Sequence, residues 1–169
     1  MMKSTKYLVL RILLLTGIFG TLLFTFTQSL LPPTNSNEVS EGVRGFLSVI
    51  ISPDTPFGAF VHENIRKIAH FAEYFLLGTF TSLYVVIFMP SITSMPKDRL
   101  RFVIYSFVAA LLVALFDETL QIFSERGPAI ADVWLDFSGF LTSAAVIYAV
   151  YYIISSIKNT KQNSKFKVI

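Results

Sequence analysis

Ionisable residues with the spacing of one helix face occur in the segment "RKIAHFAEY". Arg66, His70 and Glu73 are separated by four and three residues, so a helix places them on one side. Tyr74 follows His70 by four residues and lies next to that face. An imidazole beside a carboxylate is suited to proton transfer, and a guanidinium is suited to holding an anion such as phosphate.

Two further segments add carboxylates. In "DETLQ", Asp117 precedes Gln121 by one helical turn and is followed directly by Glu118. The segment "RGPAIADVWLDFSG" begins with Arg126.

The same segment places three residues on one helical stripe, Asp132, Asp136 and Gly139. Small residues allow helices to approach closely in lipid, so Gly139 is predicted to be a helix-packing residue.

A metal site is one interpretation of these residues. One imidazole with several carboxylates suits Zn²⁺, Mn²⁺ or Mg²⁺ in principle, and His70, Glu73, Glu118, Asp132 and Asp136 offer such atoms. No known ligand spacing such as HExxH is present, however. We therefore assign no metal ligand and no cofactor from the sequence, and an acid–base pair of His70 and Glu73 stays open.

The elements that position these residues are apolar. The chain has 169 residues, of which 53% are hydrophobic and 15% charged, whereas about a quarter of a soluble domain is charged. Four runs are long enough to cross a membrane as helices. The sequence thus predicts an all-α integral membrane four-helix bundle, with helices over about 7–27, 68–89, 102–123 and 133–154.

The ionisable residues fall inside the ends of these runs. A single Asp at the middle of a spanning helix costs roughly 2.5–3.5 kcal/mol on insertion scales, so several are tolerated only if they face one another, a counter-ion or a wet cavity. We expect a shared polar pocket that is open to the outside. Its predicted residues are Arg66, His70, Glu73, Tyr74, Asp117, Glu118, Gln121, Arg126, Asp132 and Asp136. A buried network that only fixes helix packing is the alternative.

The predicted outer loop over residues 28–65 has two parts. "LPPTNSNEVSEG" is rich in turn residues and is predicted to be irregular. After it, Val43 and Phe46 recur at helical spacing and indicate a short amphipathic helix. A further helix start is predicted at Asp54 or Thr55, with Pro56 in its first turn and Phe57, Phe60 and Val61 half-buried. His62 is expected to be solvated.

Orientation follows from the basic residues. Ten of the 14 Lys and Arg residues lie in the N-terminal segment, the loop between the second and third helices, and the C-terminal tail. The positive-inside rule therefore predicts a multi-pass protein of the cell membrane with both termini in the cytoplasm. We expect a transmembrane domain over 1–157 and a basic cytoplasmic tail over 158–169, with membrane lipid and no nucleic acid as partner. The absence of cysteine excludes disulfides and thiol catalysis.

The order and spacing of "RKIAHFAEY", "DETLQ" and "RGPAIADVWLDFSG", together with "TQS" at the end of the first helix, resemble the VanZ-like family of small membrane proteins. That family is named for an accessory protein linked to teicoplanin resistance in Gram-positive bacteria. The resemblance implies four helices and, by association, reduced glycopeptide sensitivity, but no reaction. The positions that match are His70, Glu73, Asp117, Glu118, Gln121, Arg126, Asp132, Asp136 and Gly139.

Two classes of function are compatible with these residues. One is an envelope factor that binds a lipid-linked or cell-wall ligand and so reduces teicoplanin susceptibility. The other is an enzyme acting by acid–base or metal chemistry on an amphiphilic substrate at the outer leaflet. A purely structural role is the third alternative, and the sequence does not decide whether the chain is an enzyme.

Overall fold

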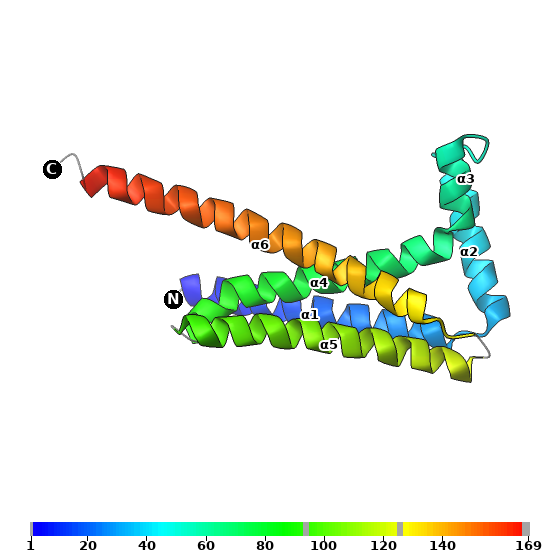
Figure 1. Cartoon of the computed structure of the whole chain (residues 1–169), viewed down its shortest axis with the longest axis horizontal. Coiled ribbons are helices and arrows are strands. Elements are labelled where there is room, and N and C mark those ends of the chain that lie inside the picture. The colour runs from blue at the N-terminus through cyan, green and yellow to red at the C-terminus, as the bar shows by residue number, and fades with distance from the viewer. Residues whose placement is uncertain (1, 93–94, 125–126, 167–169) are drawn as a thin grey trace.

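The computed structural model describes residues 2–92, 95–124 and 127–166 and contains six helices over these ranges (Figure 1). No strand occurs in these ranges. The helices are α1 (Met2–Leu30), α2 (Pro33–Ser48), α3 (Pro56–Glu63), α4 (Ile65–Ile92), α5 (Pro96–Phe123) and α6 (Ile130–Phe166). A proline occupies the first turn of α2, α3 and α5, where its missing N–H leaves no hydrogen bond unmade.

Four of the helices are long and apolar enough to cross a membrane, and they confirm the predicted all-α membrane bundle. The candidate spans are Thr5–Leu30, Ile65–Pro90, Pro96–Phe123 and Ile130–Lys158. Lipid offers no hydrogen-bond partner to the backbone, so a helix is the conformation that satisfies each span internally. The helices extend several residues beyond the predicted limits, and α6 continues past residue 157 to Phe166 without a break.

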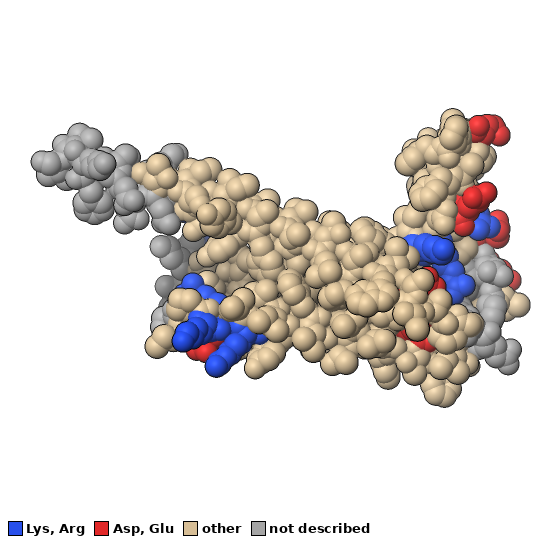
Figure 2. All heavy atoms as spheres, in the orientation of Figure 1, with Lys and Arg blue, Asp and Glu red and all other residues tan. Residues whose placement is uncertain are grey.

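The surface of the bundle is consistent with its location in a membrane. Large apolar side chains are exposed along the four long helices, as expected where lipid replaces water. Figure 2 shows, on the face in view, a wide belt without acidic or basic side chains between two ends where charges gather. The ends of α1 and α6 that carry the termini lie at one end of the bundle, and α2 and α3 lie at the other (Figure 1).

The contact between α4 and α6 is the most extensive one between helices, and two glycines permit it. A Cβ atom at Gly139 of α6 would overlap the carbonyl oxygen of Phe71 in α4. From the other side, a Cβ atom at Gly78 would lie 2.7 Å from the carbonyl oxygen of Phe140. The two backbones therefore approach more closely than any larger residue would allow. Helix α1 packs against α4 and α5, and α5 also packs against α6.

The segment between the first two spanning helices differs from the prediction. "LPPTNSNEVSEG" is not irregular, because helix α2 begins at Pro33 and continues through the amphipathic stretch to Ser48. The proline supplies a fixed backbone angle suited to a helix start, and no glycine lies between Pro33 and Gly42.

Helix α3 agrees with the prediction in its start and differs in its packing. Thr55 is the N-cap, and its side chain accepts a hydrogen bond from the backbone N–H of Gly58. Val61 is buried, but Phe57 and Phe60 are exposed rather than half-buried. His62 is half-buried, with Nε2 3.2 Å from the carbonyl oxygen of Ile51, so it is not simply solvated.

Candidate functional site

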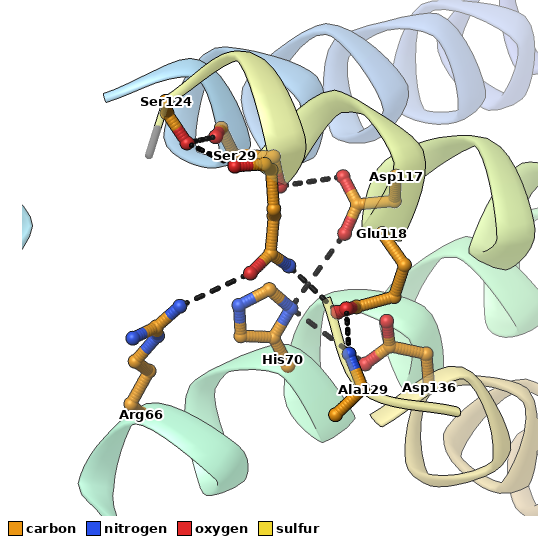
Figure 3. A network of polar contacts seen from close by, with 9 residues as sticks. Ser29, Arg66, His70, Asp117, Glu118, Ser124, Ala129 and Asp136 are labelled. Atoms are coloured by element: carbon orange, nitrogen blue, oxygen red, sulfur yellow. Dashed lines mark hydrogen bonds and ion pairs between the residues drawn. The ribbon is translucent and has the colours of Figure 1, made fainter. Parts of the chain in front are cut away.

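The polar residues of the spanning helices meet at the end of the bundle that carries α2 and α3. Ser29 lies in the last turn of α1, Arg66 and His70 in the first turns of α4, and Asp136 in the second turn of α6. Asp117 lies two turns before the end of α5. The four long helices contribute these polar side chains at a similar depth along the bundle, because each of the helices begins or ends near this end. Figure 3 shows these side chains pointing toward a common centre.

Asp117 is completely buried, with a relative exposure of 0%, and its two oxygens have different surroundings. The hydroxyl of Ser29 donates a hydrogen bond of 2.6 Å to Oδ1. The other oxygen, Oδ2, lies 3.8 Å from Nδ1 of His70. Ser29 is itself held in place, because the hydroxyl of Ser124 donates a hydrogen bond of 2.8 Å to its carbonyl oxygen.

Asp136 faces the same edge of the His70 ring as Asp117 does (Figure 3). Its Oδ1 lies 3.6 Å from the same Nδ1 atom. The side chain has a relative exposure of 0%, and neither oxygen has a hydrogen-bond partner among the described residues. A buried carboxylate without hydrogen bonds is expensive, so its presence on α6 needs an explanation other than stability.

A chain of hydrogen bonds connects Glu118 to the start of α4. Gln121 donates from Nε2 to Oε1 of Glu118 over 2.6 Å and accepts at Oε1 from Arg66 over 3.1 Å. The backbone N–H of Ala129, just before α6, donates to Oε2 of Glu118 over 2.9 Å. One oxygen of Glu118 is therefore connected through Gln121 to α4, and the other joins α5 to the segment just before α6.

Two further predicted residues lie beside this network. Tyr74 is buried, and its hydroxyl has no hydrogen-bond partner within the described ranges. Glu73 is half-buried on the face of α4 toward α1, where the buried hydroxyl of Thr25 is its hydrogen-bond partner.

A cavity of about 290 Å³ lies between α1, α2 and α4. Its polar wall consists of the side chains of Gln28, Ser40, Arg66, His70 and Glu73. The remaining wall is apolar and is formed by Phe24, Val43, Ile65, Ala69, Ala72 and Leu76. His70 belongs to both the cavity and the carboxylate cluster, so the two features form one site.

The sequence model of the VanZ/LLP1 family matches residues 8–154 of the chain. The chain belongs to the VanZ/LLP1 family. The match includes most of α1 and all of α2 and α3, and so extends beyond the segments that carry the resemblance in sequence. No curated protein and no solved structure matches the chain.

Among the described residues, acidic side chains predominate at the site of this VanZ/LLP1 protein. No Lys or Arg of the described ranges forms an ion pair with Glu118 or Asp136, and Arg66 donates a hydrogen bond to Gln121 instead. Asp132 is half-buried in the first turn of α6, outside the hydrogen-bonded network of the described side chains. Arg126 lies outside the described residues.

Three hydroxyl residues of the VanZ/LLP1 site are less evident from sequence. The sequence indicates only the polar segment "TQS" at the end of the first helix, yet Ser29 of this segment is buried at the centre of the site. Thr25 and Ser124 were not predicted at all. Thr25 and Ser29 are four residues apart in an apolar helix, so a polar face on the first helix was the available indication.

The arrangement permits two kinds of chemistry. His70 between two carboxylates is suited to accepting or donating a proton, with an aspartate orienting the ring. His70, Asp117 and Asp136 also offer one ligand atom each within 4.8 Å of one another, so they are the described residues best placed to hold a metal ion.

Proposed function

We propose that this membrane protein binds an amphiphile with an anionic head group, at the outer leaflet of the cell membrane. The cavity between α1, α2 and α4 is the observation that carries the proposal. Its apolar wall includes Phe24, Val43 and Leu76, which are 54%, 42% and 50% exposed, so the cavity opens at a surface that lipid would cover. Its polar end offers the guanidinium of Arg66 to the head group.

Arg66 is suited to this role because little of its hydrogen-bonding capacity is used. A guanidinium has five N–H donors, and a single bond, from Nη2 to Gln121, is made to the described side chains. An amphiphile bound here would be lipid-linked or derived from the cell surface. Sequestering such a molecule would alter the envelope target of teicoplanin, and reduced teicoplanin susceptibility is the cellular effect that we propose.

Retention of anionic lipid tests this proposal. We expect Arg66→Gln to weaken the binding of an anionic lipid by roughly 10–150-fold, because a hydrogen bond to a charged group contributes about 1.5–3 kcal/mol. Native mass spectrometry of the purified protein in detergent, titrated with phosphatidylglycerol, measures the effect. Lys67→Gln is the matched control, since it removes the same charge from the next residue, which does not line the cavity. Equal losses in both variants would contradict the proposal.

The proposed placement requires the end with α2 and α3 to face outward. The chain has no cysteine, so single cysteines introduced at Glu41 of α2 and at Lys97 of α5 report topology directly. Both positions are exposed. We expect an impermeant maleimide to label Glu41→Cys in intact cells and to label Lys97→Cys only after lysis. The reverse pattern would place the cavity on the cytoplasmic side.

An enzyme is the second candidate, and the position of His70 between two buried aspartates favours it. In that case the amphiphile is a substrate, and His70 acts as general base or acid toward its head group. Incubation of the protein with a bacterial lipid extract separates the two candidates. A binding protein returns every lipid unchanged, whereas an enzyme converts one class into a product that lipid mass spectrometry identifies.

A further inference from the structure

His70, Asp117 and Asp136 come from three different helices and present one imidazole nitrogen and two carboxylate oxygens to a common point (Figure 3). Nδ1 of His70 lies 3.6 Å from Asp136 and 3.8 Å from Asp117. These separations are longer than a hydrogen bond. They are close to the separation of about 3.3 Å between ligand atoms around a tetrahedral ion with bonds near 2.0–2.1 Å.

The buried state of Asp136 is the second observation. Its exposure is 0%, and neither of its oxygens accepts a hydrogen bond from any described residue, although it points at His70. The single N–H that an imidazole nitrogen carries reaches one acceptor, so His70 does not satisfy both oxygens of Asp136. A divalent cation between the three groups would supply the missing positive charge.

The surroundings of Asp117 fit a ligand of this kind. The Ser29 hydroxyl donates a hydrogen bond of 2.6 Å to Oδ1 of Asp117, and Oδ2 of Asp117 faces His70. A hydrogen bond to the outer oxygen of a ligating carboxylate fixes its orientation, as in characterised metal sites. Ser29 is in turn held through its carbonyl oxygen by Ser124.

We infer that His70, Asp117 and Asp136 form a site for one divalent transition-metal ion, with Zn²⁺ or Mn²⁺ preferred over Mg²⁺ and Ca²⁺. The imidazole ligand sets this preference, because Mg²⁺ and Ca²⁺ favour oxygen atoms throughout. Three protein ligands leave at least one coordination position open. His70 also lines the cavity, although the two aspartates do not, so the ion lies next to the polar end of the cavity, and water completes its shell.

Metal binding is tested on the full-length protein, purified without a histidine tag in detergent. After treatment with a chelator, the protein is titrated with Mn²⁺, and free Mn²⁺ is followed by electron paramagnetic resonance; Zn²⁺ is then added as competitor. We expect one ion per chain. Asp136→Asn should bind Mn²⁺ at least about tenfold more weakly than the wild type. Ser29→Ala should weaken Mn²⁺ binding by a factor of about 10–100, because loss of a hydrogen bond that supports a ligand typically has that effect. Glu63→Gln, which removes an exposed carboxylate from α3, should bind as the wild type does.

The outcomes separate this inference from the proposed lipid ligand, because the titration contains no added lipid. Folded wild type that takes up no Mn²⁺ or Zn²⁺ would overturn it, as would an Asp136→Asn variant with unchanged affinity. If Asp136→Asn does not fold, Ser29→Ala provides the same test, because it leaves all three ligands in place. A rise in melting temperature with Zn²⁺ that a chelator reverses would give independent support.

Discussion

Replacement of Asp136 by Asn is expected to weaken metal binding and to abolish any effect on teicoplanin susceptibility, while the metal-free protein folds at least as well as the wild type. Asp136 is completely buried, and its oxygens receive no hydrogen bond from the described residues. Removing the charge therefore removes a desolvation cost and breaks no hydrogen bond seen among those residues. A residue kept despite such a cost serves function rather than stability.

Glu118→Gln is the matched comparison, because it is the same chemical change with the opposite expected effect on stability. Glu118 accepts from Gln121 at one oxygen and from the N–H of Ala129 at the other. A glutamine places an NH₂ group against one of these two donors, so one buried donor loses its acceptor. We expect a loss of roughly 1–3 kcal/mol.

Both variants are compared by thermal unfolding in detergent with a chelator present, by membrane abundance, and by the Mn²⁺ titration. The ordering of the melting temperatures is the decisive result: Asp136→Asn at or above the wild type, and Glu118→Gln below it. A loss of roughly 3–5 kcal/mol in Asp136→Asn would instead be the behaviour of a buried ion pair with His70. In that case the cluster fixes helix packing, and its role as a site fails.

Replacement of Gly139 by Ala is expected to destabilise the bundle, and Gly139→Leu is expected to prevent accumulation of folded protein. A Cβ atom at this position overlaps the carbonyl oxygen of Phe71 and lies 3.3 Å from the N atom of Phe75. These are backbone atoms of α4, so they do not move without displacing the helix. Overpacking of this kind costs about 1–3 kcal/mol for a methyl group, and more for a larger side chain.

Gly20→Ala is the control for this experiment, since Gly20 also lies within a spanning helix and a Cβ atom there meets nothing within 4 Å. It should leave stability unchanged or raise it by up to about 1 kcal/mol, the difference in helix propensity between the two residues. Thermal unfolding in detergent and size-exclusion profiles measure both variants. If Gly139→Ala has the same melting temperature as Gly20→Ala, then α6 has room to shift, and the close approach of α6 to α4 is not required for stability.

The sequence by itself determined the membrane class and the number of spanning helices. Each follows from a local rule. About 20 apolar residues must form a helix in lipid, because the backbone finds no other partner there. The proline and cap at the start of α3 are local in the same way, since Thr55 needs only Gly58 three residues later.

The prediction of an irregular segment over "LPPTNSNEVSEG" was wrong for a related reason. Its turn residues permit a helix as well as a loop, and composition alone does not choose between them. Helix α2 packs against α4, and its side chains Ser40 and Val43 line the cavity. Tertiary contact therefore decided the conformation where local preference was weak.

Only the tertiary structure decided which polar residues meet. Spacing placed Asp117 and Glu118 side by side, yet Asp117 faces His70 and Ser29, whereas Glu118 turns to Gln121 and the backbone of Ala129. The rotation of each helix about its axis sets these pairings. That rotation depends on close contacts such as Gly139 against Phe71, which join residues far apart in the chain. No local pattern encodes them, because the energy of such contacts depends on both helices at once.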